Sequence, residues 1–304
     1  MSSGFKVIAA GIQATIQDMG RVGLADIGVS SAGALDEFAF HTANRLLGND
    51  FGTNMLEIVF GGVKLKAKGE TTIVLTGAQV DATINNKKIE IWKTYKISDG
   101  DVINLGFATS GARVYLGVKG GFNIEKDYGS CSVSVKEKLG GNPLHVKQFL
   151  PFTCKVLKDN RKLPKNYQPN YGKILTLRLV AGYQWDMFED EEKKKFFNST
   201  YNVTGQNDRM GYRLSGEKIV STSKGIISEP IAYGSVQIPT HGEPIVLLKE
   251  RQTIGGYPKI GSVIPVDCFR LAQAKQDSEI RFELIDLDEA REISIKFYKF
   301  FKEF

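Results

Sequence analysis

The sequence of 304 residues contains only three cysteines and three histidines. Cys131, Cys154 and Cys268 are odd in number, widely spaced and without a CxxC pair, which argues against a disulfide framework and a structural zinc site. The histidines form neither an HxxxH nor an HExxH arrangement, so we expect no metal site. Only His241, in the turn-like sequence PTHG, stands where an active-site role stays open.

Long apolar runs are missing as well. No stretch approaches the roughly 18 consecutive apolar residues of a membrane-spanning helix. Residues 1–6 lead directly into an alternating strand pattern without an apolar signal region. GxSxG, Walker and strand-linked GxGxxG motifs are absent too, which removes the commonest hydrolase, NTPase and dinucleotide signatures. We therefore expect a soluble, cytoplasmic protein of less common chemistry.

Charge of one sign is not concentrated anywhere. Lys and Arg number 40 and Asp and Glu 34, giving a net charge of +6 that is spread along most of the chain. No basic arm suggests nucleic-acid binding, and the run 189–195 changes from acidic to basic, as is typical of an exposed helix face. With 42% hydrophobic residues the chain is globular, and its length suggests about two domains.

Glycine is abundant, with 32 residues against nine prolines, and this favours a β-rich protein with many tight turns. In the first half, strand patterns bounded by turn residues cover 7–10, 55–60, 72–75, 89–92, 102–105 and 113–118. Asn85 and Asn86 predict a hairpin turn, because Asn tolerates left-handed backbone conformations. Apolar residues at helical spacing predict one helix over 35–47, with Asp36 near its start and Gly48 as its stop.

The polar segment 158–172 is too polar to bury and predicts a linker between two β-rich subdomains, 1–157 and 173–286. Strands are expected in the second subdomain at 174–180, 232–239, 245–248 and 280–285, with helices at 184–197 and 267–274. Residues 287–304 predict a C-terminal helix that packs on the body, with partner binding as the alternative. The fold class is therefore mainly β, with a few helices.

Several glycine-rich clusters carry side chains that donate or accept hydrogen bonds in fixed directions. They cover 17–36 and 43–49 together with Glu57, then 207–214, and finally segments between Glu229 and Asp267. Arginine offers a planar fork suited to carboxylate or phosphate, and glycine lets backbone amides approach the same ligand. These loops predict a site for a small anionic or amide-bearing molecule. The alternative is that their Arg and Asp residues pair with one another or cap turns.

Six of these stretches, taken in order, resemble the biotin-dependent carboxyltransferase-like family, also called allophanate hydrolase subunit 2 or KipA-like. They are 15–21 (TIQDMGR), 33–36 (GALD), 43–49 (ANRLLGN), 207–214 (NDRMGYRL), 234–239 (GSVQIP) and 251–258 (RQTIGGYP). The resemblance extends from about Lys6 to Phe282 and implies two cyclophilin-like β-barrel subdomains. One departure is Cys131, which stands where family members usually carry an arginine.

The resemblance also implies a function, because bacterial members include the C subunit of ATP-dependent 5-oxoprolinase. We expect an amidohydrolase subunit, inactive alone, that works with A-like and B-like (KipI-like) subunits to hydrolyse the 5-oxoproline lactam to glutamate. ATP with Mg would be used by the complex, since this unstrained amide is a poor electrophile until its oxygen is phosphorylated. The alternatives are the carboxyltransferase of a biotin-dependent urea or amide carboxylase, although this chain has no Met-Lys-Met biotin-attachment segment, and a KipI-binding regulator.

Site residues follow from the matching motifs. Arg209 and Arg213 are expected to bind the substrate carboxylate or phosphoryl oxygens, and Asp208 or Glu229 to act as the general base. The other expected substrate-binding residues are Gln17, Asp18, Arg21, Asp36, Asn44, Tyr212, Gln237, Gln252, Thr253, Gly255 and Tyr257.

Overall fold

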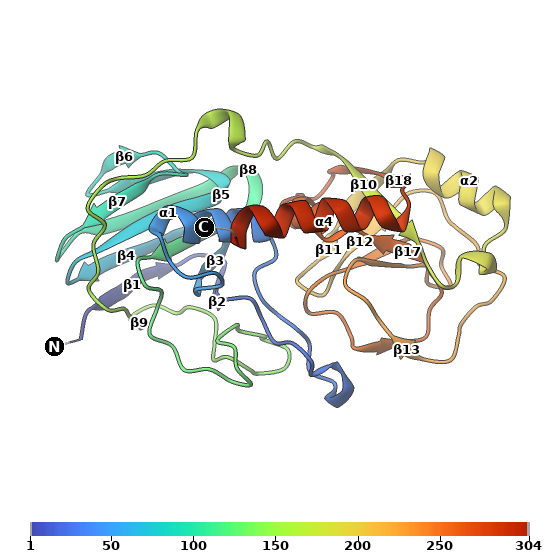
Figure 1. Ribbon diagram of the computed structural model, residues 1–304, viewed down its shortest axis with the longest axis horizontal. Coiled ribbons are helices and arrows are strands. Elements are labelled where there is room, and N and C mark those ends of the chain that lie inside the picture. Colours follow the sequence, from blue (N-terminus) through green and yellow to red (C-terminus); the bar gives the residue numbers. More distant parts are fainter. Residues whose placement is uncertain (1, 303–304) are drawn as a thin grey trace. The chain divides into compact units, whose positions relative to one another are not determined.

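A computed structural model describes residues 2–302 and divides the chain into two compact units. The first unit comprises the chain up to Arg21 and Ala32–Tyr171, and the second comprises Val22–Ser31 and the chain from Gly172 onward. Strands make up most of the regular structure in both units, which confirms the mainly β prediction (Figure 1). No helix within residues 2–302 is long and apolar enough to cross a membrane.

The first unit is built on a nine-stranded antiparallel sheet around a large apolar core. Its strands are β1 (Gly4–Ala10), β2 (Gln13–Gln17), β3 (Met55–Val59), β4 (Val63–Lys68), β5 (Thr71–Ile84), β6 (Lys87–Ile89), β7 (Thr94–Ile97), β8 (Val102–Val118) and β9 (Phe149–Pro151). The main path runs β2-β3-β8-β4-β1-β9, and β5 pairs with β6, β7 and β8. A short 3-10 turn, η2 (Lys165–Tyr167), follows near the end of the unit.

Strand β8 joins two segments that the sequence predicted as separate strands, 102–105 and 113–118. Register shifts along its pairing with β5 let the long strand bend instead of breaking. The predicted hairpin is confirmed, because Asn85 and Asn86 both have positive φ between β5 and β6. The predicted strand 89–92 is wrong beyond Ile89: Trp92 takes a positive φ and its side chain enters the core.

Helix α1 (Glu37–Leu47) confirms the helix predicted over 35–47. The carboxylate of Asp36 caps its N-terminus by accepting the backbone N–H of Ala39, and Gly48 ends it in a left-handed conformation. The helix packs on β5, where the Thr76 hydroxyl donates to the carbonyl of Ala39.

Residues 158–171, which we expected to form a linker, group with the first unit. The backbone N–H of Leu163 donates to the carbonyl of Trp92, and the Leu163 side chain packs against the core. Tyr171 donates its hydroxyl to the Asp36 carboxylate. The segment can lie along the unit because its charged side chains stay exposed while these apolar side chains turn inward.

The second unit is a closed seven-stranded barrel. Its order is β10 (Ile174–Ala181), β17 (Lys259–Val263), β14 (Ser235–Gln237), β15 (Ile245–Leu247), β12 (Gly211–Ser215), β11 (Tyr201–Asn207) and β18 (Glu279–Leu284). Strands β10 and β18 pair in parallel and close the barrel, whereas the other neighbours are antiparallel. A separate two-stranded ribbon joins β13 (Glu229–Pro230) to β16 (Ile254–Gly255).

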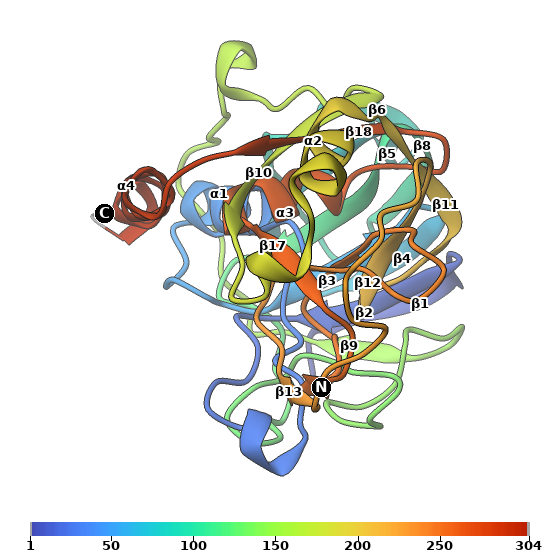
Figure 2. The same ribbon diagram turned by 90° about the vertical axis from the view of Figure 1, so that its right-hand side faces the viewer.

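The helices of the second unit are short except for the last. They are η1 (Ala25–Ile27), η3 (Trp185–Met187), α2 (Asp190–Asn198), α3 (Pro265–Leu271) and α4 (Leu287–Lys302). The helix predicted over 184–197 is interrupted at Phe188, whose backbone is extended and whose side chain is buried. Helix α3 packs on β10 (Figure 2). Helix α4 packs on α3 through Phe297 and Phe269. The last two residues of the predicted terminal helix lie outside the described residues.

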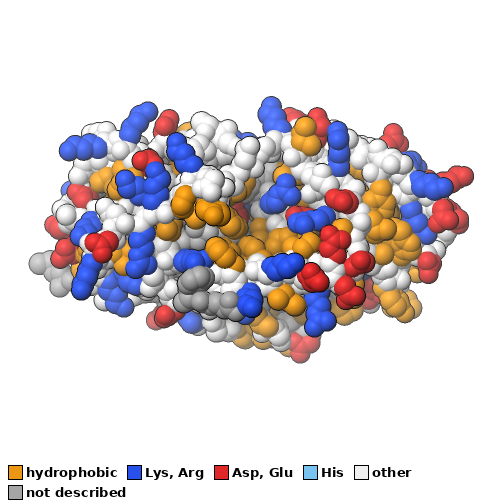
Figure 3. All heavy atoms as spheres, turned by 45° about the horizontal axis from the view of Figure 1, so that its top comes forward, with side chains coloured by type: hydrophobic (Ala, Val, Ile, Leu, Met, Phe, Trp, Pro, Cys, Tyr) orange, Lys and Arg blue, Asp and Glu red, His pale blue; other side chains and the backbone are white. Residues whose placement is uncertain are grey.

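Charges of both signs are interspersed on the molecular face drawn in Figure 3, with apolar side chains between them. This distribution agrees with the modest net charge of +6. On this face we see no broad field of one sign that would attract a polyanion.

Candidate functional site

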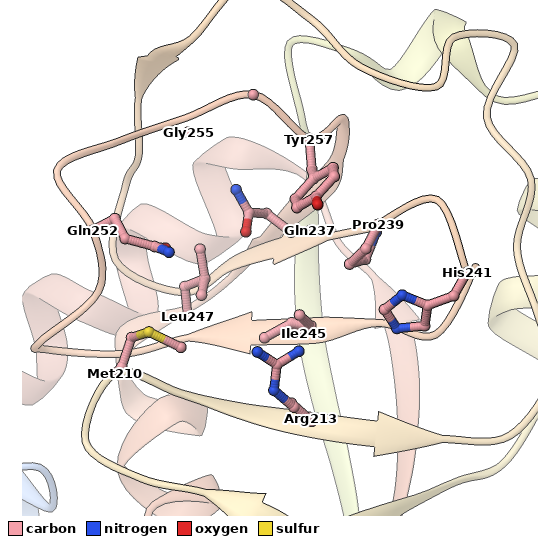
Figure 4. Close-up of a pocket in the computed structure, with 11 residues that line it drawn as sticks. Met210, Arg213, Gln237, Pro239, His241, Ile245, Leu247, Gln252, Gly255 and Tyr257 are labelled. Carbon is pink, nitrogen blue, oxygen red and sulfur yellow. The ribbon is translucent and has the colours of Figure 1, made fainter.

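The second unit contains a cavity whose floor is one row of side chains across three strands. Arg213 on β12 and Gln237 on β14 each pair with Ile245 on β15, between them. Side chains at paired positions point to the same face of a sheet, so all three project into the cavity (Figure 4). Two strand spacings separate the backbones of Arg213 and Gln237 by about 10 Å.

The walls come from the adjoining loops and the β13–β16 ribbon. The cavity has a volume of about 270 Å³ and is lined by Met210, Arg213, Gln237, Pro239, His241, Ile245, Leu247, Gln252, Gly255, Gly256 and Tyr257. Aliphatic side chains alternate there with a cation and two primary amides. This volume lies near the lower end, about 300 Å³, of the pockets that hold small ligands.

Arg213 is the cation of this cavity. Its guanidinium makes no hydrogen bond or ion pair with any residue in the described part of the chain, and it points over Ile245 in Figure 4. Strand alternation sends the preceding Tyr212 to the opposite face, where its hydroxyl donates to the carbonyl of Ala272. Only one of these two expected residues therefore reaches the cavity.

Gln237 supplies a buried amide to the same space. Its side chain is 4% exposed and forms no side-chain hydrogen bond with the residues at 2–302. A Cβ atom at Gly255 would lie 2.9 Å from Gln237 Nε2, so the absence of a side chain at Gly255 leaves room for the amide. The amide faces the cavity without a partner among the described residues, so it is available to a polar ligand.

A second hollow adjoins the first and shares Arg213, His241 and Ile245 with it. It measures about 430 Å³, and its remaining lining residues are Thr204, Gly205, Gln206, Leu214, Glu243 and Pro244. His241 Nε2 lies 4.0 Å from Glu243 Oε2, and both side chains are partly exposed. The guanidinium of Arg213 thus faces ligand-sized space on two sides.

Other residues expected at the site are engaged elsewhere. Arg209 is buried and donates from Nε to Glu250 in an ion pair. The Asp208 carboxylate accepts the backbone N–H groups of Met210 and Gly211, which stabilises the turn before β12. Neither Asp208 nor Arg209 lines the cavity, and Thr253 does not line it either.

Glu229 also lies outside the cavity lining, although its strand pairs with Gly255. Its carboxylate binds the ammonium group of Lys259 and accepts a hydrogen bond from Gln184 Nε2 at 2.7 Å. The hydrogen bond from Lys259 lowers the pKa of Glu229, against a smaller opposing effect of burial, and the hydrogen bond from Gln184 lowers it further. An ionised carboxylate held in this way is a weak proton acceptor.

In the first unit, all five expected binding residues form internal hydrogen bonds, beginning with Gln17, Asp36 and Asn44. Gln17 Nε2 donates to the Thr15 hydroxyl and the Val133 carbonyl, and its Oε1 accepts the N–H of Gly33. Asp36 caps α1, as described above. Asn44 donates from Nδ2 to the carbonyl of Thr53 and accepts from Asn49. These side chains organise loops of the first unit.

Asp18 anchors the loop around Cys131. Its carboxylate accepts hydrogen bonds from the hydroxyls of Ser130 and Ser132 and from the backbone N–H groups of Gly20 and Cys131. Burial acts to raise the pKa of Asp18, but these hydrogen bonds together outweigh it and the pKa lies below its usual value. Burial, followed by the nearby Asp18 charge, raises the pKa of the Cys131 thiol to about 12.

Arg21, the last of the expected first-unit residues, has hydrogen-bond donors without an acceptor among the described residues. Its side chain is buried and Nε donates to the carbonyl of Asp127 at 3.2 Å. Nη1 and Nη2 have no hydrogen-bond partner among the described residues.

The structure thus brings five of the expected residues together: Arg213, Gln237, Gln252, Gly255 and Tyr257. The sequence reasoning did not assign Met210, Pro239, His241, Ile245, Leu247 and Gly256 to the site. The sequence offered some indication of three of them. His241 stands in the turn-like sequence PTHG, and Ile245 and Leu247 lie two residues apart on a predicted strand, so they point to the same face. No group of three or more His, Cys, Asp or Glu residues within 2–302 is arranged to hold a metal ion.

Comparison with known proteins gives a consistent picture. The family model described as carboxyltransferase domain, subdomain A and B, matches residues 27–284. The 5-oxoprolinase C subunit of Escherichia coli is 32% identical over 296 residues, which cover 94% of this chain and 92% of the relative. The 5-oxoprolinase C subunit of Haemophilus influenzae is 30% identical over 292 residues, covering 93% and 92%.

Among solved structures, the urea carboxylase of Kluyveromyces lactis superposes with a TM-score of 0.94 at 25% sequence identity. The similarity covers 99% of this chain but only 29% of that larger chain. The urea amidolyase of the same yeast gives a TM-score of 0.92 at 25% identity, over 99% of this chain and 20% of the other.

Proposed function

Because this chain belongs to the carboxyltransferase domain family, subdomains A and B, we propose that it is the C subunit of a 5-oxoprolinase and that its second unit binds 5-oxoproline. The two bacterial C subunits of 5-oxoprolinase match it over more than nine-tenths of both chains. The observation that carries the binding role is that one small cavity holds the guanidinium of Arg213 and the amide of Gln237, neither of which has a hydrogen-bond partner within residues 2–302.

The chemistry of this cavity is complementary to the substrate. 5-Oxoproline has one carboxylate, one secondary amide and two ring methylene groups. Arg213 would bind the carboxylate through charge-assisted hydrogen bonds. The Gln237 amide would donate from Nε2 to the lactam carbonyl and accept the lactam N–H at Oε1. Ile245 and Leu247 would pack against the methylene groups, since they form a small apolar cluster on this face.

Hydrolysis of this lactam requires activation that the cavity does not supply. Its lining contains no carboxylate, and the two expected bases, Asp208 and Glu229, are engaged elsewhere. We therefore assign to this chain the binding and orientation of 5-oxoproline. ATP-dependent activation of the amide oxygen and attack by water would need the assembled enzyme, with A-like and B-like (KipI-like) subunits.

We propose that ATP and Mg are bound by the assembled complex and not in this cavity. A cavity of about 270 Å³ with a single guanidinium suits a small substrate better than a triphosphate nucleotide with its metal ion.

We also propose a cytoplasmic location. All three cysteines of the chain are unpaired thiols, as is usual in a reducing compartment.

A second candidate function is carboxyl transfer to urea or another amide. It is favoured by the high structural similarity to the Kluyveromyces lactis urea carboxylase, and Arg213 could equally hold the carboxyl group that is transferred. This chain corresponds to less than a third of that enzyme, so the remaining functions would come from other chains. Turnover assays with 5-oxoproline and with carboxybiotin and urea distinguish the two candidates.

A binding experiment on the purified chain tests the proposed substrate contacts. Calorimetric titration compares 5-oxoproline with 2-pyrrolidinone, which lacks the carboxylate, and with proline, which lacks the lactam carbonyl. We expect 5-oxoproline to bind most tightly, and Arg213→Gln to remove its advantage over 2-pyrrolidinone while leaving the affinity for 2-pyrrolidinone unchanged. Equal losses for both lactams in Arg213→Gln would contradict the assigned carboxylate contact.

A further inference from the structure

A buried arginine in the first unit has two donor groups without a partner. Arg21 follows β2, and its side chain is only 3% exposed. Its Nε is used, because it donates to the carbonyl of Asp127 at 3.2 Å. Both terminal nitrogens, Nη1 and Nη2, are buried and find no acceptor within residues 2–302.

No carboxylate within residues 2–302 forms an ion pair with this guanidinium. A guanidinium stays protonated in proteins, and burying such a charge without an ion partner is strongly unfavourable. Asp18 stands in the same TIQDMGR stretch as Arg21, but its carboxylate accepts hydrogen bonds from the 130–132 loop and Gly20. The carboxylate of Asp127 accepts the backbone N–H of Gly140. Arg21 has no ion pair in the described part of the chain.

Other arginines of this chain show the arrangement that Arg21 lacks. Arg178 uses Nε and Nη2 to bind both oxygens of Asp267, each at 2.8 Å. Arg209, which is buried to a similar degree, pairs with Glu250. Arg21 is as deeply buried as Arg209 yet has no such partner.

We infer that Arg21 binds an oxyanion of a ligand, end-on through Nη1 and Nη2. Two neighbouring N–H groups of a guanidinium match the spacing of two oxygens on a carboxylate or a phosphoryl group, and such bidentate contacts are both strong and directional. The ligand class is therefore a small molecule that carries a carboxylate or phosphate. Arg21 lines neither hollow of the second unit, so this contact does not rest on the proposed 5-oxoproline cavity.

The first experiment measures thermal stability of the full chain in buffers of equal ionic strength that contain chloride, acetate or inorganic phosphate. It uses the Arg213→Gln variant as background, so that the guanidinium of the 5-oxoproline cavity does not contribute to the response. Ligand binding to the folded chain raises the midpoint Tm as the ligand concentration rises. We expect acetate or phosphate to raise Tm above the chloride value, and the anion with the larger effect identifies the ligand class. Arg21→Gln is expected to abolish this response and to keep the chloride Tm of the background or exceed it, because it removes an uncompensated buried charge.

Two control variants separate this site from other effects. Arg209→Gln breaks an internal ion pair, so it should lower Tm in all three buffers while keeping the anion response. Because the background already carries Arg213→Gln, a response that Arg21→Gln removes is independent of the 5-oxoproline cavity. A second readout is the NMR signal of the Arg21 side-chain nitrogens, which is assigned by its loss in Arg21→Lys. In the wild type this signal should shift and reach saturation as acetate or phosphate is added.

The inference is overturned if neither acetate nor phosphate gives a response beyond chloride, or if the response persists in Arg21→Gln. It is also overturned if Arg21→Gln lowers Tm equally in all three buffers and the Arg21 resonances of the wild type do not shift. That pattern would mean that Arg21 serves only the packing of its own loop.

Discussion

Arg213 and Gln237 project from the same face of the barrel, and each is paired with Ile245 on the strand between them. This register places a cation and an amide about two strand spacings apart over an aliphatic floor. Since neither side chain has a hydrogen-bond partner within residues 2–302, the arrangement is open to a ligand that carries an anion and an amide.

Arg213→Gln tests the cation. A hydrogen bond to a charged group is worth about 1.5–3 kcal/mol, so we expect the affinity for 5-oxoproline to fall by roughly ten- to hundredfold. Stability should change little, because the guanidinium of Arg213 makes no ion pair or hydrogen bond with the described residues. Calorimetric titration and a Tm measurement on the same sample check both expectations, and a large loss of Tm with unchanged affinity would contradict them.

Gly255→Ala tests the space around the amide. The added Cβ would lie 2.9 Å from Gln237 Nε2 and 2.7 Å from Ile231 Cδ1, so the Gln237 side chain must move. We expect weaker 5-oxoproline binding. The matched control is Gly256→Ala, whose Cβ would meet the Ile226 carbonyl oxygen at 3.1 Å and no atom of Gln237. Equal effects of the two substitutions on affinity would argue against a specific role for the amide.

Arg209 is expected to affect stability and not binding. Its side chain is 8% exposed and pairs with Glu250, which is 7% exposed. Removing one partner leaves a buried charge alone, which typically costs about 3–5 kcal/mol. We expect Arg209→Gln to lower the free energy of unfolding of the second unit in urea. The double variant Arg209→Gln, Glu250→Gln should recover part of this loss, and the absence of any recovery would contradict the paired-charge explanation.

Asp18 gives a pH dependence with a defined sign. Its pKa in the folded chain lies below the usual value of 3.8, so the ionised carboxylate stabilises the fold above that value. This contribution is lost as the pH falls through the lowered folded pKa. We therefore expect Asp18→Asn to be less stable than the wild type at neutral pH, and the difference to shrink on acidification. A difference that grows on acidification would contradict the direction of the shift.

The three cysteines should differ in reactivity. Burial raises the pKa of Cys131 to about 12, and burial also raises the pKa of Cys268, whereas Cys154 is exposed. Because the thiolate is the reactive form, iodoacetamide should label Cys154 first in the native chain. Peptide mass spectrometry checks the order. Cys154→Ser should remain unlabelled until the chain is unfolded, and rapid native labelling of Cys131 would show that its loop opens.

The sequence predicted the local elements well where the signal is local. The cap at Asp36, the stop at Gly48 and the Asn85-Asn86 turn each depend on the backbone preferences of one or two residues. Strand 89–92 was wrong because burial of the Trp92 side chain, which depends on the whole core, overrides its strand propensity.

The composition of the site was harder to predict because motifs do not show which neighbours are already paired. Arg209 and Arg213 stand in one motif. The guanidinium of Arg209 forms an ion pair with Glu250, whereas the guanidinium of Arg213 has no partner in the described part of the chain. Asp18 and Glu229 have suitable chemistry, but their partners come from distant segments. Long-range pairing of this kind is a property of the fold and is not visible in the spacing of residues.

Turnover by the assembled enzyme tests whether this chain supplies the 5-oxoproline site of a multisubunit 5-oxoprolinase. The most direct measurement is the release of ADP and glutamate from ATP and 5-oxoproline, by the chain alone and by its mixture with A-like and B-like subunits. We expect turnover only in the mixture, and its loss when Arg213→Gln replaces the wild-type chain. Turnover that is equally fast without this chain, or with Arg213→Gln in its place, would show that the 5-oxoproline site lies elsewhere.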